Sequence, residues 1–405
     1  KNKIEVCIMK KVFLTAITIA MLWGIKAFGM YGWSSLWIGF PTDPNQLRIR
    51  TDQLGFVLGN GTIKGTFGFK ANRGILGYGN IFEVNSSSTS DQHNSESSFL
   101  NSTVSAGLAY TSDAISVGVG YNFTYFDRFI QVHTPVLVLK VSDKFRMAIP
   151  IRVAAGKRYT ANIGTNTSES LVSPQSTTKT NDYLGVSIHS QFRIYPGIDL
   201  LRQIRLYVNY GMNKLADNSD KNYSITRQNF SFQLRIYQDY YVESVRLQPY
   251  LRIMFSTALN NNYGKSFNGQ NSKYGTIGSY DGLSASSGWN NADAASWISG
   301  SSSDRNPWFF NIAIPLGIFA NSDILSFYFM PELGLSITGN ADKSVKEKYA
   351  LSYGIYAEIY MTPIKNVEWY NELGMNGASD AAGITGIKWE VSSGITWYLP
   401  SLQNN

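Results

Sequence analysis

The chain has almost no cysteine: Cys7 is the only one among its 405 residues, which excludes an intramolecular disulfide framework. It also lacks a long hydrophobic run, because no apolar stretch approaches the roughly 20 residues that a membrane-spanning helix needs. Charged residues make up only 16% of the chain. Residues 1–29 carry most of the formal net charge of +7, so the remainder is nearly balanced and gives no basis for predicting nucleic-acid binding.

The first 29 residues have the composition of a secretory leader. Met9–Lys11 is a basic segment, Val12–Leu22 is an apolar segment, and Ala27–Gly29 is a small-x-small cleavage site. The apolar segment holds about eleven residues and is too short to span a membrane. We therefore predict a signal peptide over 9–29, with residues 1–8 upstream of the natural start.

Most of the chain after the leader alternates between apolar and polar residues. In Ile115–Tyr125, isoleucine, valine, tyrosine and phenylalanine fall on one face, while serine, glycine, asparagine and threonine fall on the other. A strand of this kind is half buried, against either a protein core or a lipid bilayer. About fourteen such stretches follow one another along the chain.

The breaks between these stretches alternate between short and long, as they do at the two rims of an outer-membrane barrel. A soluble β-sandwich is the alternative, but it has no reason to place its long loops on every second connection. We therefore predict short periplasmic turns and long external loops. The short breaks are Thr111–Ala114, Ser142–Lys144, Pro196–Arg202, Asp239–Ser244, Ala320–Asp323 and Thr362–Asn366; between them fall Asn85–Asn101, the brief Asp127–Phe129, Gly156–Thr180, Lys214–Tyr223, Asn260–Asn306, Gly339–Glu347 and Gly377–Gly383.

The strand count depends on the N-terminal part of the barrel. Thirteen strands between Thr103 and Leu399, together with Gly74–Val84, give fourteen. Leu47–Gly59 and Thr62–Phe69 flank Asn60-Gly61, the dipeptide of a type I′ hairpin, and raise the count to sixteen. We predict an all-β fold, a transmembrane antiparallel barrel of about sixteen strands within a range of 14–18. The barrel would occupy 46–400, after an N-terminal periplasmic segment over 30–45 and before a tail at 401–405.

The last strand offers a check of scale. Trp389 and Trp397 lie on the same face, eight residues apart, which is roughly 26 Å at ~3.3 Å per residue. At a tilt of about 40° the separation projects to roughly 20 Å, close to the ~25 Å apolar band of such barrels with an aromatic residue at each border.

Charged residues on the opposite face separate by sign along the sequence. Arginines occur in the middle strands and glutamates in the late strands, which line different walls of a closed barrel. Opposed walls of opposite sign create a transverse field that orients and sorts polar solutes, although charges on this face can also merely stay solvated or pair with each other. The predicted pore-lining residues are Arg152, Arg193, Arg205, Arg227, Arg235, Arg246, Arg252, Glu332, Glu358, Glu368, Glu372 and Glu390.

The sequence offers little for an enzyme. Ser187 and His189 share the inward face of one strand, where a barrel hydrolase would carry a nucleophile and its base. Lumen serines are common, however, and His93 and His133 suggest no catalytic arrangement. No metal-ligand spacing, phosphate loop or carboxylate pair stands out. We predict no enzymatic activity and no cofactor.

Some N-terminal segments carry a family resemblance. Met9–Val12, Ala27–Gly32, Asp52–Asn60 and Thr62–Phe69 resemble the variable surface protein family of the spirochaete genus Brachyspira, formerly Serpulina. They cover about the N-terminal sixth of the chain. Trp33–Trp37 replaces a more charged segment that is typical of the family. The resemblance implies a surface-exposed antigen of the outer membrane.

Two functions remain open at this point. The barrel forms a diffusion pore for small polar solutes, or it anchors external loops that act as an adhesin or as a variable surface antigen. The charged inner face favours the pore, and the long polar loops favour the surface role. The predicted partners are outer-membrane lipid, small polar solutes, and host surface molecules or antibodies at the loops. The sequence leaves homo-oligomer formation undecided.

Overall fold

A computed structural model describes most of the chain as one closed antiparallel sheet, preceded by a short 3-10 helix, η1 (Ser34–Thr42). No helix in the described part is both long and apolar enough to cross a membrane. The described residues are 34–50, 53–71, 82–85, 102–125, 130–160, 179–217, 224–259, 307–340, 346–380 and 383–399.

The strands become longer from the N-terminal to the C-terminal half of the ring. In chain order they are β1 (Gln46–Arg50), β2 (Gln53–Gly59), β3 (Ile63–Ala71), β4 (Phe82–Asn85), β5 (Ser102–Tyr110), β6 (Ile115–Tyr125), β7 (Ile130–Val141), β8 (Phe145–Thr160), β9 (Lys179–Ile194), β10 (Leu201–Asp217), β11 (Ser224–Gln238), β12 (Tyr240–Val242), β13 (Val245–Ala258), β14 (Pro307–Asn321), β15 (Leu325–Asn340), β16 (Lys348–Ile364), β17 (Val367–Asp380) and β18 (Gly383–Leu399).

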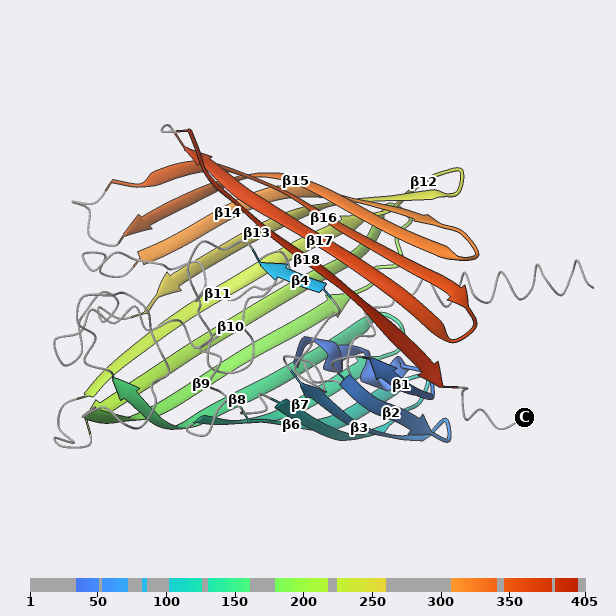
Figure 1. Cartoon of the computed structure of the whole chain (residues 1–405), viewed down its shortest axis with the longest axis horizontal. Helices are drawn as coiled ribbons and strands as arrows, with labels where there is room; N and C mark the ends of the chain where they lie inside the picture. The colour runs from blue at the N-terminus through green and yellow to red at the C-terminus, as the bar shows by residue number, and fades with distance from the viewer. Residues whose placement is uncertain are drawn as a thin grey trace, which may run out of the picture.

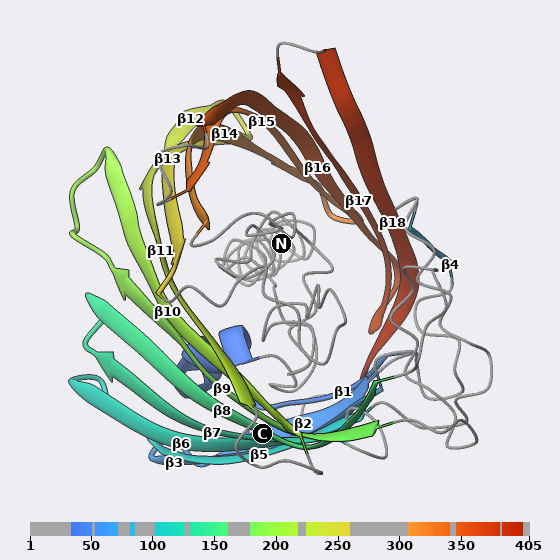
Figure 2. The same cartoon turned by 90° about the vertical axis from the view of Figure 1, so that its left-hand side faces the viewer.

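Pairing of the first strand with the last closes the barrel. β1 pairs with β18, with Leu47 opposite Leu399, and with β2 on its other side. β11 and β12 both pair with β13 and form one interrupted strand. β4 pairs with β18 while β3 pairs directly with β5. The ring therefore contains sixteen strands, seen from the side in Figure 1 and along its axis in Figure 2, and the preferred count is confirmed.

Side chains alternate between an inner and an outer face, as the sequence pattern predicts. On β6, Ser116 and Asn122 are 1% and 3% exposed, whereas Val119 is 58% exposed. Trp389 and Trp397 both lie on the outer face and are exposed. The large exposed residues are thus apolar and face where lipid surrounds a barrel of this kind.

Most short connections occur where the sequence places them, although the predicted short break Asp239–Ser244 contains the three-residue strand β12. β5 and β6 are joined across Thr111–Ala114, and β7 and β8 across Ser142–Lys144. The turn between β2 and β3 differs in type. Gly61 has a φ of 92°, but Asn60 does not have a positive φ, so this is not the predicted type I′ turn, which needs a positive φ at both central residues. Instead the Asn60 side chain accepts hydrogen bonds from the amides of Thr62 and Ile63.

The N-terminal strands also differ from prediction, although the total agrees. Leu47–Gly59 is not one strand but two, because β1 and β2 pair antiparallel with each other, with Arg50 opposite Gln53. Of the predicted strand Gly74–Val84, the described part lies in β4, which sits outside the ring order because β3 pairs with β5. One predicted strand is lost from the ring and one is gained, so the count stays at sixteen.

Several strands extend into segments that were predicted to be loops. β8 runs to Thr160, β10 to Asp217 and β17 to Asp380. The rest of the predicted long loops Asn85–Asn101 and Asn260–Asn306 lies outside the described residues.

Helix η1 is inside the ring. It packs against the inner faces of β5 to β9, and Figure 2 shows it within the outline of the barrel. Trp37 and Phe40 are completely buried there. The inside of the barrel near the short turns is thus filled in part by residues that precede the first strand.

Candidate functional site

Six basic residues form one continuous row on the inner face, one on each of six successive strands. Each lies directly opposite the next in the strand register, and all six side chains face the inside of the barrel. We call this set the cationic row. Its members are Lys140 on β7, Arg146 on β8, Arg193 on β9, Arg205 on β10, Arg235 on β11 and Arg252 on β13.

The members of the cationic row lie progressively further from the short turns, from β7 to β13. Lys140 and Arg146 lie beside the short turn Ser142–Lys144, whereas Arg235 and Arg252 lie further along their strands from the nearest short turn. This slope follows from the tilt of the strands, since the line of opposite residues runs perpendicular to them. The positive charge therefore extends from the short-turn rim toward the interior.

Uncharged side chains position the central arginines. Nε of Arg205 donates to Oε1 of Gln203 at 2.6 Å, and the guanidinium of Arg205 lies 4.6 Å from the ring centre of Tyr237. Arg235 donates to Gln233 and to the Tyr237 hydroxyl. These contacts hold the planar guanidinium groups in place. Because the glutamine and tyrosine side chains are neutral, they do not neutralise the positive charge.

An ion pair marks the end of the cationic row. Nη2 of Arg252 bonds Oε1 of Glu332 on β15. A second carboxylate, Asp239, lies at the interruption between β11 and β12, where Arg246 is 2.9 Å and Arg202 3.6 Å from its Oδ2. The sequence predicts Asp239 in a turn and predicts no carboxylate among the arginines.

The glutamates gather on three successive strands, β15 to β17, and β14 separates them from the last strand of the cationic row. Glu332 lies on β15, Glu358 on β16, and Glu368 and Glu372 on β17; we call these four the acidic sector. Glu358 lies directly opposite Glu372, an arrangement of like charges that destabilises adjacent strands.

Tyrosine hydroxyls donate hydrogen bonds to three of these carboxylates. Tyr356 donates to Glu358 at 2.5 Å, and Tyr360 donates to Glu372 at 3.1 Å. On β18, Tyr398 donates to Glu368 at 3.2 Å. Each donor stabilises the charged carboxylate that accepts its bond.

Basic residues of β1 flank the acidic sector on its other side. Arg50 lies opposite Thr396 of β18, which lies opposite Glu368 of β17. The Arg50 guanidinium is 3.9 Å from the ring centre of Tyr370. Arg48 and Lys70 also face inward and are buried. Around the ring the charge thus passes from positive to negative and back to positive.

The sequence missed part of this arrangement. Arg48, Arg50 and Lys70 were omitted, as were Lys140 and Arg146 of the cationic row. Arg146 shares its strand and parity with Arg152, so an even spacing of six residues could have identified it.

The remaining predicted pore-lining residues occupy separate places. Arg152 faces inward on β8, opposite Ser187 and apart from the cationic row. Arg246 lies near the short-turn rim with Asp239. Arg227 lies on β11 opposite Asn213, and Glu390 on β18 opposite Gly374; the side chains of Arg227 and Glu390 lie outside the described part.

The histidines do not assemble a catalytic group in the described part of the chain. His189 lies on β9 opposite Asn209, and Ser187 lies opposite Gly211. On the outer face, Nδ1 of His133 is 2.5 Å from the Tyr121 hydroxyl. His93 lies outside the described residues. The described part contains no group of three or more histidine, cysteine, aspartate or glutamate side chains that could hold a metal ion.

Comparison with known proteins gives a family match over nearly the whole chain. Residues 10–398 match the family described as Serpulina hyodysenteriae variable surface protein. No curated protein matches the chain.

Several solved barrels are similar in outline only. A bacterial polysaccharide outer membrane secretin is 10% identical, with a TM-score of 0.44 over 88% of this chain and 98% of the other. Outer-membrane expressed OmpT of Vibrio cholerae is 10% identical, with a TM-score of 0.34 over 85% and 100%. The translocator domain of the autotransporter NalP from Neisseria meningitidis is 11% identical, with a TM-score of 0.28 over 90% and 92%. Likeness at this level is no guide to function.

Proposed function

This chain belongs to the Serpulina hyodysenteriae variable surface protein family, and we propose that its barrel forms a water-filled diffusion pore for small polar solutes. Its family and its barrel fold place it in the outer membrane, with surface-exposed segments. A ring of sixteen strands is wide enough to leave an aqueous channel between its walls.

The separation of charge on the inner face is the observation that carries this proposal. The cationic row occupies six successive strands from β7 to β13, and the acidic sector occupies β15 to β17. Rows of one sign on opposed walls orient polar solutes and bias the passage of ions. An anchor that only holds loops has no need of this arrangement.

The test is ion selectivity in planar lipid bilayers. The variant combines Arg193→Gln, Arg205→Gln and Arg235→Gln, which removes three positive charges but retains hydrogen-bond donors. Under a salt gradient, the reversal potential should shift toward higher cation permeability. The shift should be largest at low salt, because the Debye length reaches roughly 30 Å at 0.01 M.

A matched variant checks that the shift comes from charge in the pore. Lys144→Gln removes one positive charge from the exposed turn between β7 and β8, and should shift the reversal potential much less than Arg205→Gln alone, which also removes one charge. If the triple variant conducts with the wild-type reversal potential, the cationic row does not control the passage of ions.

The second candidate is a surface antigen or adhesin in which the barrel is an anchor. The polar composition of Asn85–Asn101 and Asn260–Asn306 favours it, since long polar loops at a barrel rim are accessible to host molecules. If purified, folded wild-type protein gives no conductance, the pore function is contradicted and the role as a surface antigen or adhesin remains.

A further inference from the structure

Helix η1 is held inside the barrel by aromatic packing. Trp37 and Phe40 meet edge to face, with ring centres 5.4 Å apart. Together with Ile38 they pack on the inner face of the wall, where the contacting residues are small or medium in size. A segment of nine residues has no core of its own, so this packing against the wall is what keeps η1 in place.

The wall opposite Trp37 is shaped to accept it. Gly107 on β5 and Gly120 on β6 are directly opposite each other in the register. A Cβ atom at Gly107 would come within 2.6 Å of the Trp37 ring, and one at Gly120 within 2.5 Å. The indole Nε1 donates to Oδ1 of Asn122 at 3.2 Å. Only glycine at these two positions leaves room for the indole, so the wall and η1 are complementary in shape.

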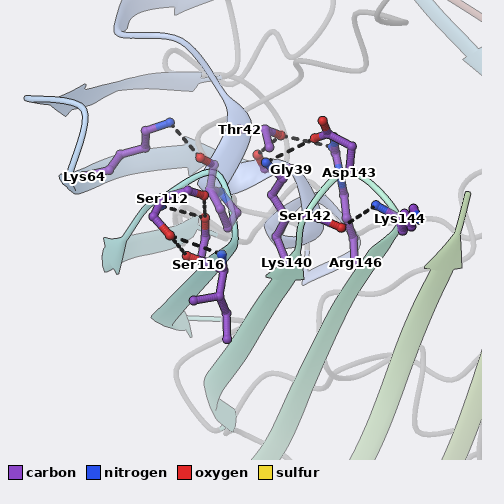
Figure 3. A network of polar contacts seen from close by, with 12 residues as sticks. Gly39, Thr42, Lys64, Ser112, Ser116, Lys140, Ser142, Asp143, Lys144 and Arg146 are labelled. Atoms are coloured by element: carbon purple, nitrogen blue, oxygen red, sulfur yellow. Dashed lines mark hydrogen bonds and ion pairs between the residues drawn. The ribbon is translucent and has the colours of Figure 1, made fainter.

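The C-terminal end of η1 is fixed from two sides. Nζ of Lys64, on β3, donates to the carbonyl oxygens of Pro41 and Asp43. Nη1 of Arg146, on β8, donates to Oγ1 of Thr42 at 3.1 Å. Figure 3 shows Lys64 and Arg146 approaching this end from different strands. Because Arg146 belongs to the cationic row, η1 ends where that row begins.

We propose that η1 is a built-in constriction of the pore and sets the largest solute that can pass the short-turn rim. The inference rests on the proposed pore function. An α-helix with its side chains is about 10 Å across, and a 3-10 helix is only slightly narrower, so η1 fixed against one wall removes a large share of the cross-section. The solutes admitted are then small and polar, and they pass beside the lower end of the cationic row.

The test loosens η1 and measures the size of the opening. Trp37→Ala removes the main aromatic anchor, and Gly120→Leu fills the space that the indole occupies, so the two variants attack the same contact from opposite sides. Both should raise single-channel conductance in planar bilayers. Both should also admit neutral polyethylene glycols that the wild-type pore excludes. Because these polymers are uncharged, the size limit is measured separately from the ion selectivity of the cationic row.

The control uses a glycine that does not contact η1. Gly65 lies on the outer face of β3, and the nearest neighbouring atom to an added Cβ would be 4.0 Å away. Gly65→Leu should therefore leave the size limit unchanged. Heat-modifiable mobility on gels establishes that each variant forms a barrel before its conductance is compared.

Each outcome decides one of the two claims. The constriction is overturned, but the pore is not, under the following result. The wild-type protein conducts, and the folded Trp37→Ala and Gly120→Leu variants have the same conductance and exclude the same polymers as the wild type. Wild-type protein that does not conduct overturns the pore, and the constriction with it.

A milder variant covers the case in which both substitutions prevent folding. Lys64→Gln removes one of the two attachments of the C-terminal end of η1 and leaves the bond from Arg146 to Thr42, so the open-channel current should fluctuate more than in the wild type. A steady current of wild-type size from folded Lys64→Gln protein would also overturn the constriction.

Discussion

Arg252 on β13 and Glu332 on β15 form an ion pair across the intervening strand β14. Their side chains are 6% and 4% exposed. Ala313 on β14 lies directly opposite Arg252, and its small side chain leaves the space above β14 open to the pair. The contact joins the end of the cationic row to the start of the acidic sector, so the two regions of opposite charge meet at this ion pair.

Breaking this pair should destabilise the barrel. Glu332→Gln leaves the Arg252 charge without its carboxylate, and removing one partner of a buried pair costs about 3–5 kcal/mol. The double variant Arg252→Met with Glu332→Gln should lose less stability than the sum of the losses in Arg252→Met alone and Glu332→Gln alone. Urea unfolding of protein folded into lipid vesicles measures these free energies. Additive losses across the double-mutant cycle would contradict a coupled pair.

Neutralising the facing glutamates should act in the opposite sense to neutralising the arginines. Glu358→Gln combined with Glu372→Gln removes two like charges that lie opposite each other on β16 and β17. The reversal potential should shift toward anion permeability, and stability should rise by about 0.2–1 kcal/mol because the repulsion is relieved. Planar-bilayer recordings and unfolding curves check the two effects separately. A shift toward cations would contradict the place of these residues in the pore.

A charge on the outer face should be costly. Val119 is 58% exposed on the outer face of β6, where lipid replaces water. Val119→Arg should reduce the free energy of unfolding by ~2–4 kcal/mol near the bilayer midplane and less toward its edges. Val119→Leu is the apolar control and should change stability little. An arginine that is tolerated as well as leucine would place this face outside the hydrocarbon.

Protease added to intact cells should distinguish the two rims. The segments Asn85–Asn101 and Asn260–Asn306 are long and polar, and exposed polar loops are the preferred sites of cleavage. They should be cut while the turn Ser142–Lys144 stays intact, because we predict that this turn faces the periplasm. The sites are read by mass spectrometry of the fragments. Cleavage at Ser142–Lys144 with both long segments protected would invert the predicted orientation.

The sequence correctly predicts much of the fold because a β-strand has a period of two. In Ile115–Tyr125, alternation alone separates the inner Ser116 and Asn122 from the outer Val119. The short connections Thr111–Ala114 and Ser142–Lys144 follow from the same pattern, because each marks a point where the alternation stops.

Local pattern was insufficient where two neighbouring segments compete for one place in the ring. Leu47–Gly59 has an unbroken strand pattern but folds into β1 and β2, because β1 closes the barrel against β18. Gly74–Val84 has a strand pattern too, yet β3 pairs directly with β5. Strand pairing depends on contacts between segments that are far apart in the sequence, and the local pattern of one sequence does not specify those contacts.

The sequence by itself determined that this chain is an outer-membrane barrel with arginines and glutamates on its inner face, since periodicity, loop spacing and the family resemblance are local properties. The tertiary structure alone decided that six basic residues fall into register across β7 to β13, because register depends on how far each strand slides against its neighbour. It also placed Trp37 between Gly107 and Gly120, about 70 and 83 positions away. A contact of that span exists only when the sheet has formed and the two glycines lie side by side.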